Sequence, residues 1–575
     1  MRLLTRLALA LALLAPLPAL AQTAQDPGIV VEGQRNTARG REIPMSDWRV
    51  AETTHVLVYG RGDQARLIRI AHNLERLHFL LSMLLNTVDR EDDTAKIRVT
   101  LIGDMADFDQ LGLHNVRWQT GPYPPQFQTQ LYYDPREEGA VLATAHADQK
   151  IELQRGTDLA TMEMFQPKTD ASSPSFSPAT AVAGQSIKAN EVSFPVTADS
   201  RLYAGFAQHF LMTYFPAAYP RWYLEGFGEI FATVSVDTDG IIEYGRAPEG
   251  FREVSEWSGS FPVRRIFDGS YLTPRSGGRP KWTPYRAWAL VHLLFFDETW
   301  KQPLHNYLAA LARGASPDEA IAAFGDLDRL QSALSEYRGA KVPFERLTYP
   351  PDRAGAPLVR QLNRSEANYV RGKLVLGARM EIPAEPSDAR TNALKARDKW
   401  LADLRIDVGR YPNDLEYQLL FAEAECRAGN SAGCLAAAER VLAQAPQRPG
   451  GLLWKGVALT QLANAGPEGQ RAGRLRTARS YIVRANRADT EAVMPLLAYY
   501  RSYPAGRAPD AALGGLMKAS DIVPSAPATR LMLGEELAKR GDAEGARRAL
   551  LPIAAGAYDS PEKARAQAIL DGLPK

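Results

Sequence analysis

The last third of the chain repeats a pattern of small and apolar residues about every 34 residues, and this feature limits the possible fold most. From Ser387 onward nearly every segment has apolar residues at helical spacing. The first unit, 415–446, has small and apolar residues where a two-helix repeat has them, namely Phe421, Ala422, Gly429, Cys434, Ala438, Val441 and Leu442. Similar units follow at 450–487, with an insertion near Gly466, and at 491–524 and 527–558. A single unit cannot bury its own apolar face, so at least three must stack.

The period and the closing Pro446 resemble those of tetratricopeptide repeats, which are pairs of antiparallel helices stacked into a solenoid. The aromatic residues of that consensus are sparse here, so an irregular helical bundle is the alternative. We predict an all-α, tetratricopeptide-like solenoid over residues 387–575. The concave face of such a solenoid would hold an extended segment of a protein or peptide partner.

The first 21 residues have the pattern of a secretory signal peptide. Arg2 and Arg6 precede an apolar run, 7–14, and the segment closes on Ala19-Leu20-Ala21. Cleavage after Ala21 would leave Gln22 at the new terminus, where a lipid anchor would need a cysteine. No later run reaches the roughly 18 apolar residues of a membrane span. We therefore expect a periplasmic or secreted protein without a membrane span.

Charge and cysteine content exclude several classes of function. The chain has 68 Lys and Arg residues against 66 Asp and Glu residues, and removal of Arg2 and Arg6 makes the two numbers equal. A chain without net positive charge is not expected to bind nucleic acid. Cys426 and Cys434 are the only cysteines, so an all-cysteine zinc site is excluded. They flank the turn at Gly429, where an exported chain could form a disulfide or simply bury two small residues.

Between the signal and the tail, the pattern mixes strands and helices. We expect a flexible leader at 22–45 and a Ser, Pro and Ala-rich surface loop at 168–185. The segments predicted as strands are 55–59, 97–102, 130–133 and 140–145, and those predicted as helices are 64–85, 202–214, 222–233 and 285–296. Together they predict an α+β domain with a small sheet beside a long helix.

The block at 202–232 reads LYAGFAQHFLMTYFPAAYPRWYLEGFGEIFA, a helix, a short turn and a second helix. This layout resembles that of the gluzincin clan of zinc metallopeptidases. Residues 47–347 resemble the peptidase-MA-like domains that often precede tetratricopeptide repeats in exported bacterial proteins. Active relatives have His-Glu-x-x-His on the first helix, because residues four apart face one metal and the Glu activates water. Their third zinc ligand is a Glu on the second helix, which Glu225 matches.

The first helix departs from that motif. Ala204, Gly205 and Gln208 stand where the His, the Glu and the second His would be, and a register that uses His209 as the second His places Gly205 and Phe206 at the other two positions. Ala and Gly offer no lone pair to a metal, and Gln is a poor zinc ligand. Catalytic zinc usually takes three protein ligands and a water. The resemblance therefore implies a pseudopeptidase with no catalytic residue, no metal and no cofactor.

A metal-free cleft could still bind a partner, with aromatic walls that include Tyr203 and Phe206. Its candidate binding residues are Glu225, Glu229, His209, Trp222 and Tyr223. Simpler interpretations are that Glu225 favours the start of its helix and that His209 is a hydrogen-bonded core residue.

We predict an exported, non-catalytic adaptor protein of the cell envelope that binds a protein partner. One alternative is an active zinc metallopeptidase with atypical ligands among Glu225, Glu229 and His209, and another is an envelope assembly factor. Motifs of serine hydrolases, nucleotide hydrolases and dehydrogenases are missing from the sequence. The predicted boundaries are 1–21 for the signal peptide, 22–45 for the leader, 46–345 for the peptidase-like domain, 346–386 for a linker and 387–575 for the repeats.

Overall fold

The computed structural model describes residues 37–38, 41–42, 44–87, 95–103, 105–113, 131–145, 148–154, 191–237, 239–257, 262–272, 284–337, 341–353, 355–383, 386–557 and 560–574. The predicted signal peptide, most of the leader and the loop at 168–185 lie outside these ranges. Within the leader, the short strands β1 (Thr37–Ala38) and β2 (Arg41–Glu42) pair with each other. Among the described helices, none is both long and apolar enough to span a bilayer.

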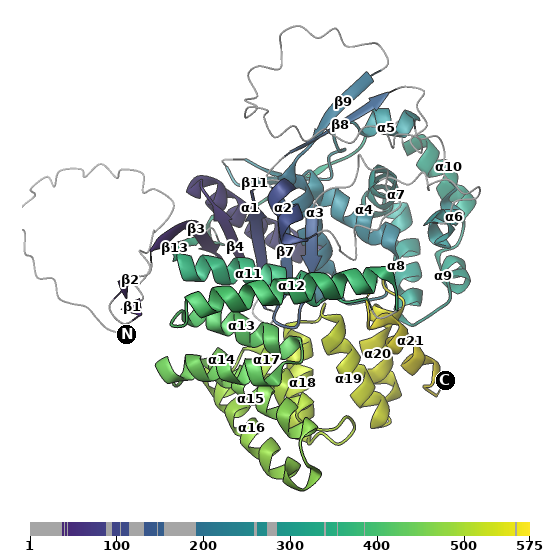
Figure 1. The fold of residues 1–575 in the computed structure, drawn as a ribbon. Helices are drawn as coiled ribbons and strands as arrows, with labels where there is room; N and C mark the ends of the chain where they lie inside the picture. The colour runs from purple at the N-terminus through teal and green to yellow at the C-terminus, as the bar shows by residue number, and fades with distance from the viewer. Residues whose placement is uncertain are drawn as a thin grey trace, which may run out of the picture.

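A six-stranded mixed sheet forms the centre of the front domain, which we define as the described residues from Met45 to Arg353 together with β13 (Figure 1). Along the sheet the strands are β13 (Leu358–Asn363), β3 (Met45–Glu52), β4 (Val56–Arg61), β5 (Ile97–Ile102), β7 (Val141–Ala145) and β6 (Leu131–Asp134). The central strands β4, β5 and β7 run parallel, and the outer pairings are antiparallel. Smaller sheets pair β8 (Gln149–Gln154) with β9 (Glu191–Val196), and join β10 (Ser235–Val236), β11 (Ile241–Tyr244) and β12 (Glu345–Thr348).

Helices surround this sheet, and the first of them follows directly from its sequence. The Asp63 carboxylate accepts a hydrogen bond from the Ala65 amide at 2.9 Å and caps α1 (Gln64–Leu84). One stripe of α1, including Leu67, Ile70 and Leu74, is fully or almost fully buried. The other front-domain helices are α2 (Met105–Leu111), α3 (Ala198–Tyr214), α4 (Arg221–Ala232), α5 (Phe251–Trp257), α6 (Val263–Phe267), η5 (Ser270–Leu272), α7 (Pro284–Phe296), α8 (Glu298–Ala312), α9 (Pro317–Phe324), α10 (Leu327–Tyr337) and η6 (Pro351–Arg353).

The segment predicted as a linker, 346–386, belongs to the folded core, and this corrects the sequence prediction. β13 pairs antiparallel with β3, from which it is about 300 residues distant in sequence. It leads into α11 (Arg364–Met380), which has a capping box formed by Asn363 and Glu366. Leu374 of α11 is buried in a front-domain cluster, and Leu376 is buried in a tail cluster. The prolines near Tyr349 therefore mark a turn inside the fold, because a strand after them completes the sheet.

The tail, residues 386–574, is helical throughout its described part, as predicted. It begins with α12 (Asp388–Arg410) and ends with α21 (Lys563–Asp571). Between these lie successive helix pairs: α13 (Leu415–Arg427) with α14 (Ser431–Gln444), α15 (Pro449–Ala465) with α16 (Glu468–Ala488), α17 (Val493–Arg501) with α18 (Asp510–Ile522), and α19 (Pro527–Lys539) with α20 (Ala543–Ala554). Each pair matches one predicted unit, and Figure 1 shows the pairs following one another below the front domain.

Candidate functional site

The helix pair predicted to hold the site is formed by α3 and α4, which pack with their backbones close together. A methyl group added at Gly228 of α4 would lie 2.9 Å from the Ala204 carbonyl oxygen and 2.7 Å from the Gln208 Nε2 atom of α3. Gln208 donates a hydrogen bond from Nε2 to the Leu224 carbonyl oxygen at 3.1 Å. Gln208 thus links the two helices by a hydrogen bond.

Gly205 packs closely against two leucine side chains of the sheet. A Cβ atom there would lie 2.6 Å from Leu131 Cδ2 and 3.3 Å from Leu142 Cδ2, which belong to β6 and β7. Carbon atoms pack at about 3.5 to 4.0 Å, so a side chain at 205 would require the Leu131 side chain to shift. Two leucines therefore fill the space that the metallopeptidase pattern assigns to the water-activating Glu.

The two carboxylates of α4 are buried and bound by arginines. Glu225 and Glu229 are each 5% exposed. Arg221 Nε lies 2.5 Å from Glu225 Oε1, and Arg201 of α3 donates to both oxygens of Glu229, with Nη2 to Oε2 at 2.8 Å. A bidentate guanidinium supplies the positive charge that a buried carboxylate needs. The pairs are therefore complete without a metal ion.

His209 contributes no donor to these carboxylates in the described structure. Its Nδ1 atom lies 3.0 Å from the Tyr133 hydroxyl of β6, and the residue is 8% exposed. Burial lowers the pKa of His209 to about 3, so the ring is neutral at physiological pH. The described residues contain no group of three His, Cys, Asp or Glu side chains placed to hold a metal. The donors at α3 and α4 do not fit a catalytic zinc ion.

Trp222 and Tyr223, which were predicted as possible cleft residues, are buried in the core. Trp222 is 1% exposed, and its ring packs on Phe267 with centroids 4.9 Å apart. Tyr223 is 7% exposed and stacks on Tyr219. Burial raises the pKa of the Tyr223 hydroxyl. All five predicted cleft residues are thus enclosed by packing.

Nearby, the fold brings together a polar cluster that the sequence analysis did not predict. His55, just before β4, lies 2.5 Å through Nδ1 from Glu75 Oε1 of α1 and stacks on His78 at 3.6 Å. His78 Nε2 lies 3.0 Å from the Tyr214 hydroxyl of α3. Burial lowers the pKa of His78 to about 3. The spacing of Glu75 and His78 on one helix was the available signal, but His55 joins them only in the tertiary structure.

In the tail, a disulfide joins Cys426 of α13 to Cys434 of α14, with their Cα atoms 5.1 Å apart. It spans the turn between the two helices of the first pair, where the sequence allowed it. A bridge that closes so short a loop stabilises the fold by about 2 to 3 kcal/mol in the chain-entropy model.

A buried charge network joins the front domain to the tail, at the turn between β6 and β7. Arg136 of this turn donates from Nη1 to the Lys373 carbonyl oxygen at 2.7 Å and from Nη2 to the Leu374 carbonyl oxygen at 3.1 Å, both on α11. Lys373 Nζ in turn lies 2.6 Å from Glu138 Oε2 and also binds Glu423 of α13. We call this network the front–tail joint.

Charge inside the joint is balanced by residues from both domains. Burial alone would raise the pKa of Glu138, but the positive charges of Lys373 and Arg427 lower it well below its usual range. Arg427 of α13 also pairs with Glu423 at 2.7 Å. Glu138 is therefore ionised, and it depends on cations held by other elements.

Contacts with the front domain continue along the tail beyond the joint. Arg501 at the end of α17 pairs with Glu137 of the same β6–β7 turn. The Ala95 amide donates to the carbonyl oxygen of Ile522, at the end of α18, at 3.0 Å. The side of the tail that faces the front domain is thus occupied by the chain itself.

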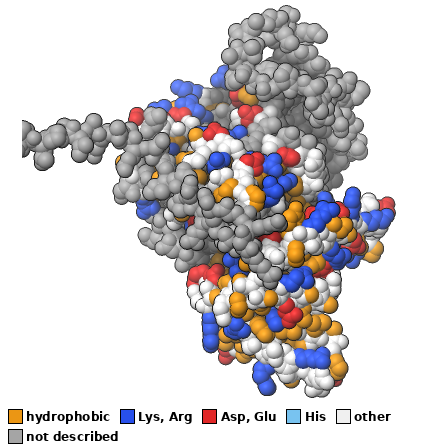
Figure 2. All heavy atoms as spheres, turned by 60° about the vertical axis from the view of Figure 1, so that its left-hand side comes forward, with side chains coloured by type: hydrophobic (Ala, Val, Ile, Leu, Met, Phe, Trp, Pro, Cys, Tyr) orange, Lys and Arg blue, Asp and Glu red, His pale blue; other side chains and the backbone are white. Residues whose placement is uncertain are grey.

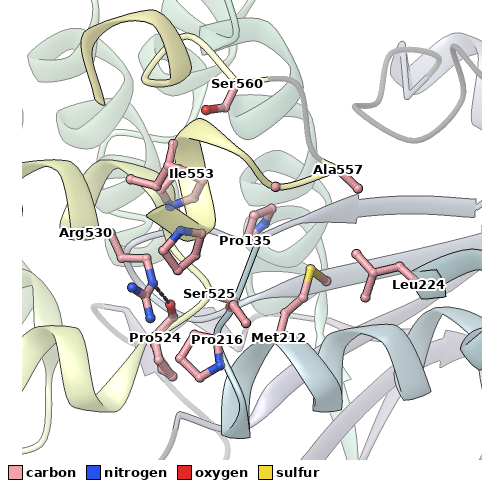
Figure 3. A pocket seen from close by; sticks show the side chains of 14 residues that line it. Pro135, Met212, Pro216, Leu224, Pro524, Ser525, Arg530, Ile553, Ala557 and Ser560 are labelled. Atoms are coloured by element: carbon pink, nitrogen blue, oxygen red, sulfur yellow. Dashed lines mark hydrogen bonds between the residues drawn. The ribbon is translucent and has the colours of Figure 1, made fainter. Parts of the chain in front are cut away.

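A cavity of about 50 Å³ lies where the front domain meets α19 and α20, and Figure 3 shows its lining of prolines and apolar side chains. Arg530, at its edge, donates from Nε to the Pro524 carbonyl oxygen and from Nη1 to the Arg548 carbonyl oxygen at 3.3 Å. That carbonyl lacks its helical donor because Pro552 has no N–H. Burial lowers the pKa of Arg530 to about 10. Arg530 thus donates the hydrogen bond that Pro552 cannot donate in this helix. The cavity has room only for small molecules such as water.

Comparisons with known proteins found one distant structural likeness. No family model matches the chain, and no curated protein matches it. Among solved structures, a thermophilic TPR protein of Thermus thermophilus is 20% identical, with a TM-score of 0.27, over 32% of this chain and 93% of that chain. A likeness at this distance carries no argument about the function of this chain.

Proposed function

We propose that this protein is an exported, non-catalytic binding protein of the cell envelope, whose front domain has a peptidase-MA-like scaffold and whose tail is a tetratricopeptide-like solenoid. The observation that carries the proposal is the packing at Gly205. A peptidase of this kind needs a carboxylate at that position, and here Leu131 and Leu142 occupy its space. The fold keeps the helix pair, but a carboxylate at 205 would require these leucine side chains to move.

The arginine pairs support the same proposal. Arg201 and Arg221 provide the positive charge for Glu229 and Glu225, so neither carboxylate needs a cation from solution. Their burial favours a structural role, since an unpaired buried carboxylate would destabilise the fold strongly. The alternative of a peptidase with atypical ligands would require His209 to leave Tyr133 and both glutamates to leave their arginines.

Export is supported by two features. Residues 1–21 have the signal-peptide pattern, and the Cys426–Cys434 bridge suits an oxidising compartment outside the cytosol. A periplasmic or secreted location follows from the proposal.

The expected partner is a protein, and it would bind a surface of the tail that does not face the front domain. The side of the tail that faces the front domain holds the β6–β7 turn, so a partner would contact the outer surfaces of the tail. Because α11 contributes to both cores, binding should be tested with both domains in one chain. An envelope pull-down of the whole chain should recover a defined protein complex, and a chain recovered alone would contradict the adaptor function. A large complex of fixed composition would instead favour an assembly factor.

Metal analysis and a peptidase assay test the absence of catalysis. The chain starting at Gln22, purified in the presence of zinc, should retain no tightly bound zinc and should not cleave unfolded casein. The variant with Ala204→His, Gly205→Glu and Gln208→His should also fail to gain zinc-dependent cleavage, because the new side chain at 205 meets Leu131 and Leu142. One equivalent of tightly held zinc together with chelator-sensitive cleavage by the unaltered chain would overturn the proposal.

A further inference from the structure

Arginines are concentrated on one helix of the tail, α16. Within its 21 residues it carries one acidic residue, Glu468 in the first turn, and six arginines: Arg471, Arg474, Arg476, Arg479, Arg484 and Arg487. Most of the chain mixes both signs of charge, with nearly equal totals. This helix therefore presents a local positive surface on a chain that has little net charge.

Four of these arginines, Arg474, Arg476, Arg484 and Arg487, are exposed, and we call them the α16 arginine patch. Their contacts within the described part of the chain are weak. Arg474 donates to Gln470, Arg484 lies 3.4 Å from Gln447 and beside the Tyr481 ring, and no carboxylate pairs with any of the four. Their guanidinium groups thus remain available to an external anion.

Arg479 of the same helix differs from the patch arginines, because it packs against the next helix pair. It donates to the Ser502 carbonyl oxygen at 2.6 Å and lies 3.7 Å over the Tyr503 ring, so it holds α16 to the next helix pair. No comparable contact holds the arginines of the patch. The patch is therefore not explained by the stacking of the solenoid.

The helix pair that carries the patch is longer than its neighbours. α15 and α16 have 17 and 21 residues, whereas the helices of the other three pairs have 9 to 14 residues. The extra length corresponds to the insertion near Gly466. Figure 1 shows α16 at the lower end of the molecule, and Figure 2 shows Lys and Arg side chains exposed at that end. The patch is consequently carried on a helix at the lower end of the molecule.

We propose that the α16 arginine patch docks this protein on the anionic head groups of a lipid bilayer. Arg476 and Arg487 lie on one side of the helix, because their spacing of eleven residues is close to three whole turns, and Arg484 lies within about a quarter turn of them. The opposite side, with Leu475, Ala478 and Ile482, is buried in the tail. A helix held in this way can set three guanidinium groups on one plane of phosphates without unfolding or inserting.

The shape of the site favours a membrane surface over an acidic peptide. A peptide is usually held in a groove, but the patch is on the exposed side of a helix, where a flat surface can reach several arginines together. Guanidinium groups bind phosphate oxygens in a bidentate manner, and each basic residue near an anionic bilayer contributes a similar increment of binding. The apolar residues between its arginines are buried, as for Leu475 and Ile482, or partly buried, as for Tyr481 and Val483, so the contact would be peripheral and sensitive to salt.

Vesicle sedimentation of the chain starting at Gln22 tests this proposal, since the apolar segment 1–21 would itself enter a bilayer. Vesicles would contain equal parts of phosphatidylethanolamine and phosphatidylglycerol, with pure phosphatidylcholine vesicles for comparison. We expect binding only to the anionic vesicles, reduced by added salt. Replacing Arg476, Arg484 and Arg487 by Gln should lower the partition coefficient on the order of a hundredfold. Gln has nearly the helix propensity of Arg, so α16 should remain folded.

The matched control replaces Arg410, Lys518 and Arg548 by Gln, which removes the same charge from other tail helices. These residues form exposed ion pairs with Asp407, Glu491 and Glu544, and the control variant should bind vesicles like the unaltered chain. Equal binding by the patch variant, or failure of the unaltered chain to bind anionic vesicles, would overturn the proposal. If the unaltered chain instead bound polyglutamate and the patch variant did not, the partner would be an acidic polypeptide and not a membrane.

Discussion

The α3–α4 helix pair and the front–tail joint both bury carboxylates against basic side chains, but they differ in what those pairs hold together. At α3–α4, Arg201 and Arg221 each bind one glutamate, and all four groups belong to one domain. At the joint, Lys373 binds Glu138 from the front domain and Glu423 from the tail. The region that the sequence predicted as the functional site is thus held together within one domain, while a turn without any recognisable motif connects the two domains.

The largest effect is expected from Lys373→Ala in the joint. It would leave Glu138 and Glu423 buried without their shared cation, and breaking a buried pair in this way costs about 3 to 5 kcal/mol. Urea unfolding of the whole chain measures the loss. Lys301→Ala, which removes an exposed pair with Glu298, is the control and should have a small effect. Equal stability of the two variants would show that the joint does not stabilise the domain arrangement.

The pH dependence of the free energy of unfolding distinguishes the α3–α4 helix pair from the front–tail joint. His209 and His78 have pKa values near 3 when folded against 6.5 when unfolded, so the unfolded chain takes up protons first as the pH falls. The free energy of unfolding should therefore decrease from pH 6.5 downward, by about 1.4 kcal/mol per pH unit for each His. The lowered pKa of Glu138 affects stability at more acidic pH. Its contribution to the free energy of unfolding is present above pH 4.5 and is lost as the pH falls below that value.

His209→Gln checks this assignment. Between pH 6.5 and 4.5, the variant should lose the contribution of one His to the slope of unfolding free energy against pH. Lys373→Ala should keep the whole slope in that range. Urea midpoints measured at a series of pH values give both slopes. An unchanged slope in the His209 variant would mean that its ring is not held neutral by burial.

A smaller effect is expected from Gly205→Ala on α3. The added methyl group would press on Leu131 and Leu142, and overpacking of this kind costs about 1 to 3 kcal/mol. Gly473→Ala on α16 is the matched control, since its Cβ would meet nothing within 4 Å and alanine favours a helix by about 1 kcal/mol. Thermal unfolding should therefore shift in opposite directions for the two variants. A stabilised Gly205 variant would mean that space remains at this position.

Much of the fold could be predicted because it depends on local pattern. The strand at 97–102 and the helix at 64–85 have clear periods, and each predicted tail unit became a helix pair. The linker prediction was wrong because the Pro-rich stretch near Tyr349 hid a strand whose partner lies about 300 residues earlier. The capping box of Asn363 and Glu366 was a local signal for α11 that the prediction overlooked.

For the candidate site, the sequence alone determined which groups are missing from α3, because the identity of a residue fixes which functional groups its side chain carries. Only the tertiary structure decided what replaced them: leucines from β6 and β7 at Gly205, and Arg201 against Glu229. The same holds for the joint, where β6, β7, α11 and α13 meet. Periodicity is a property of neighbouring residues, whereas these contacts join segments far apart in the chain and exist only when the whole core is packed.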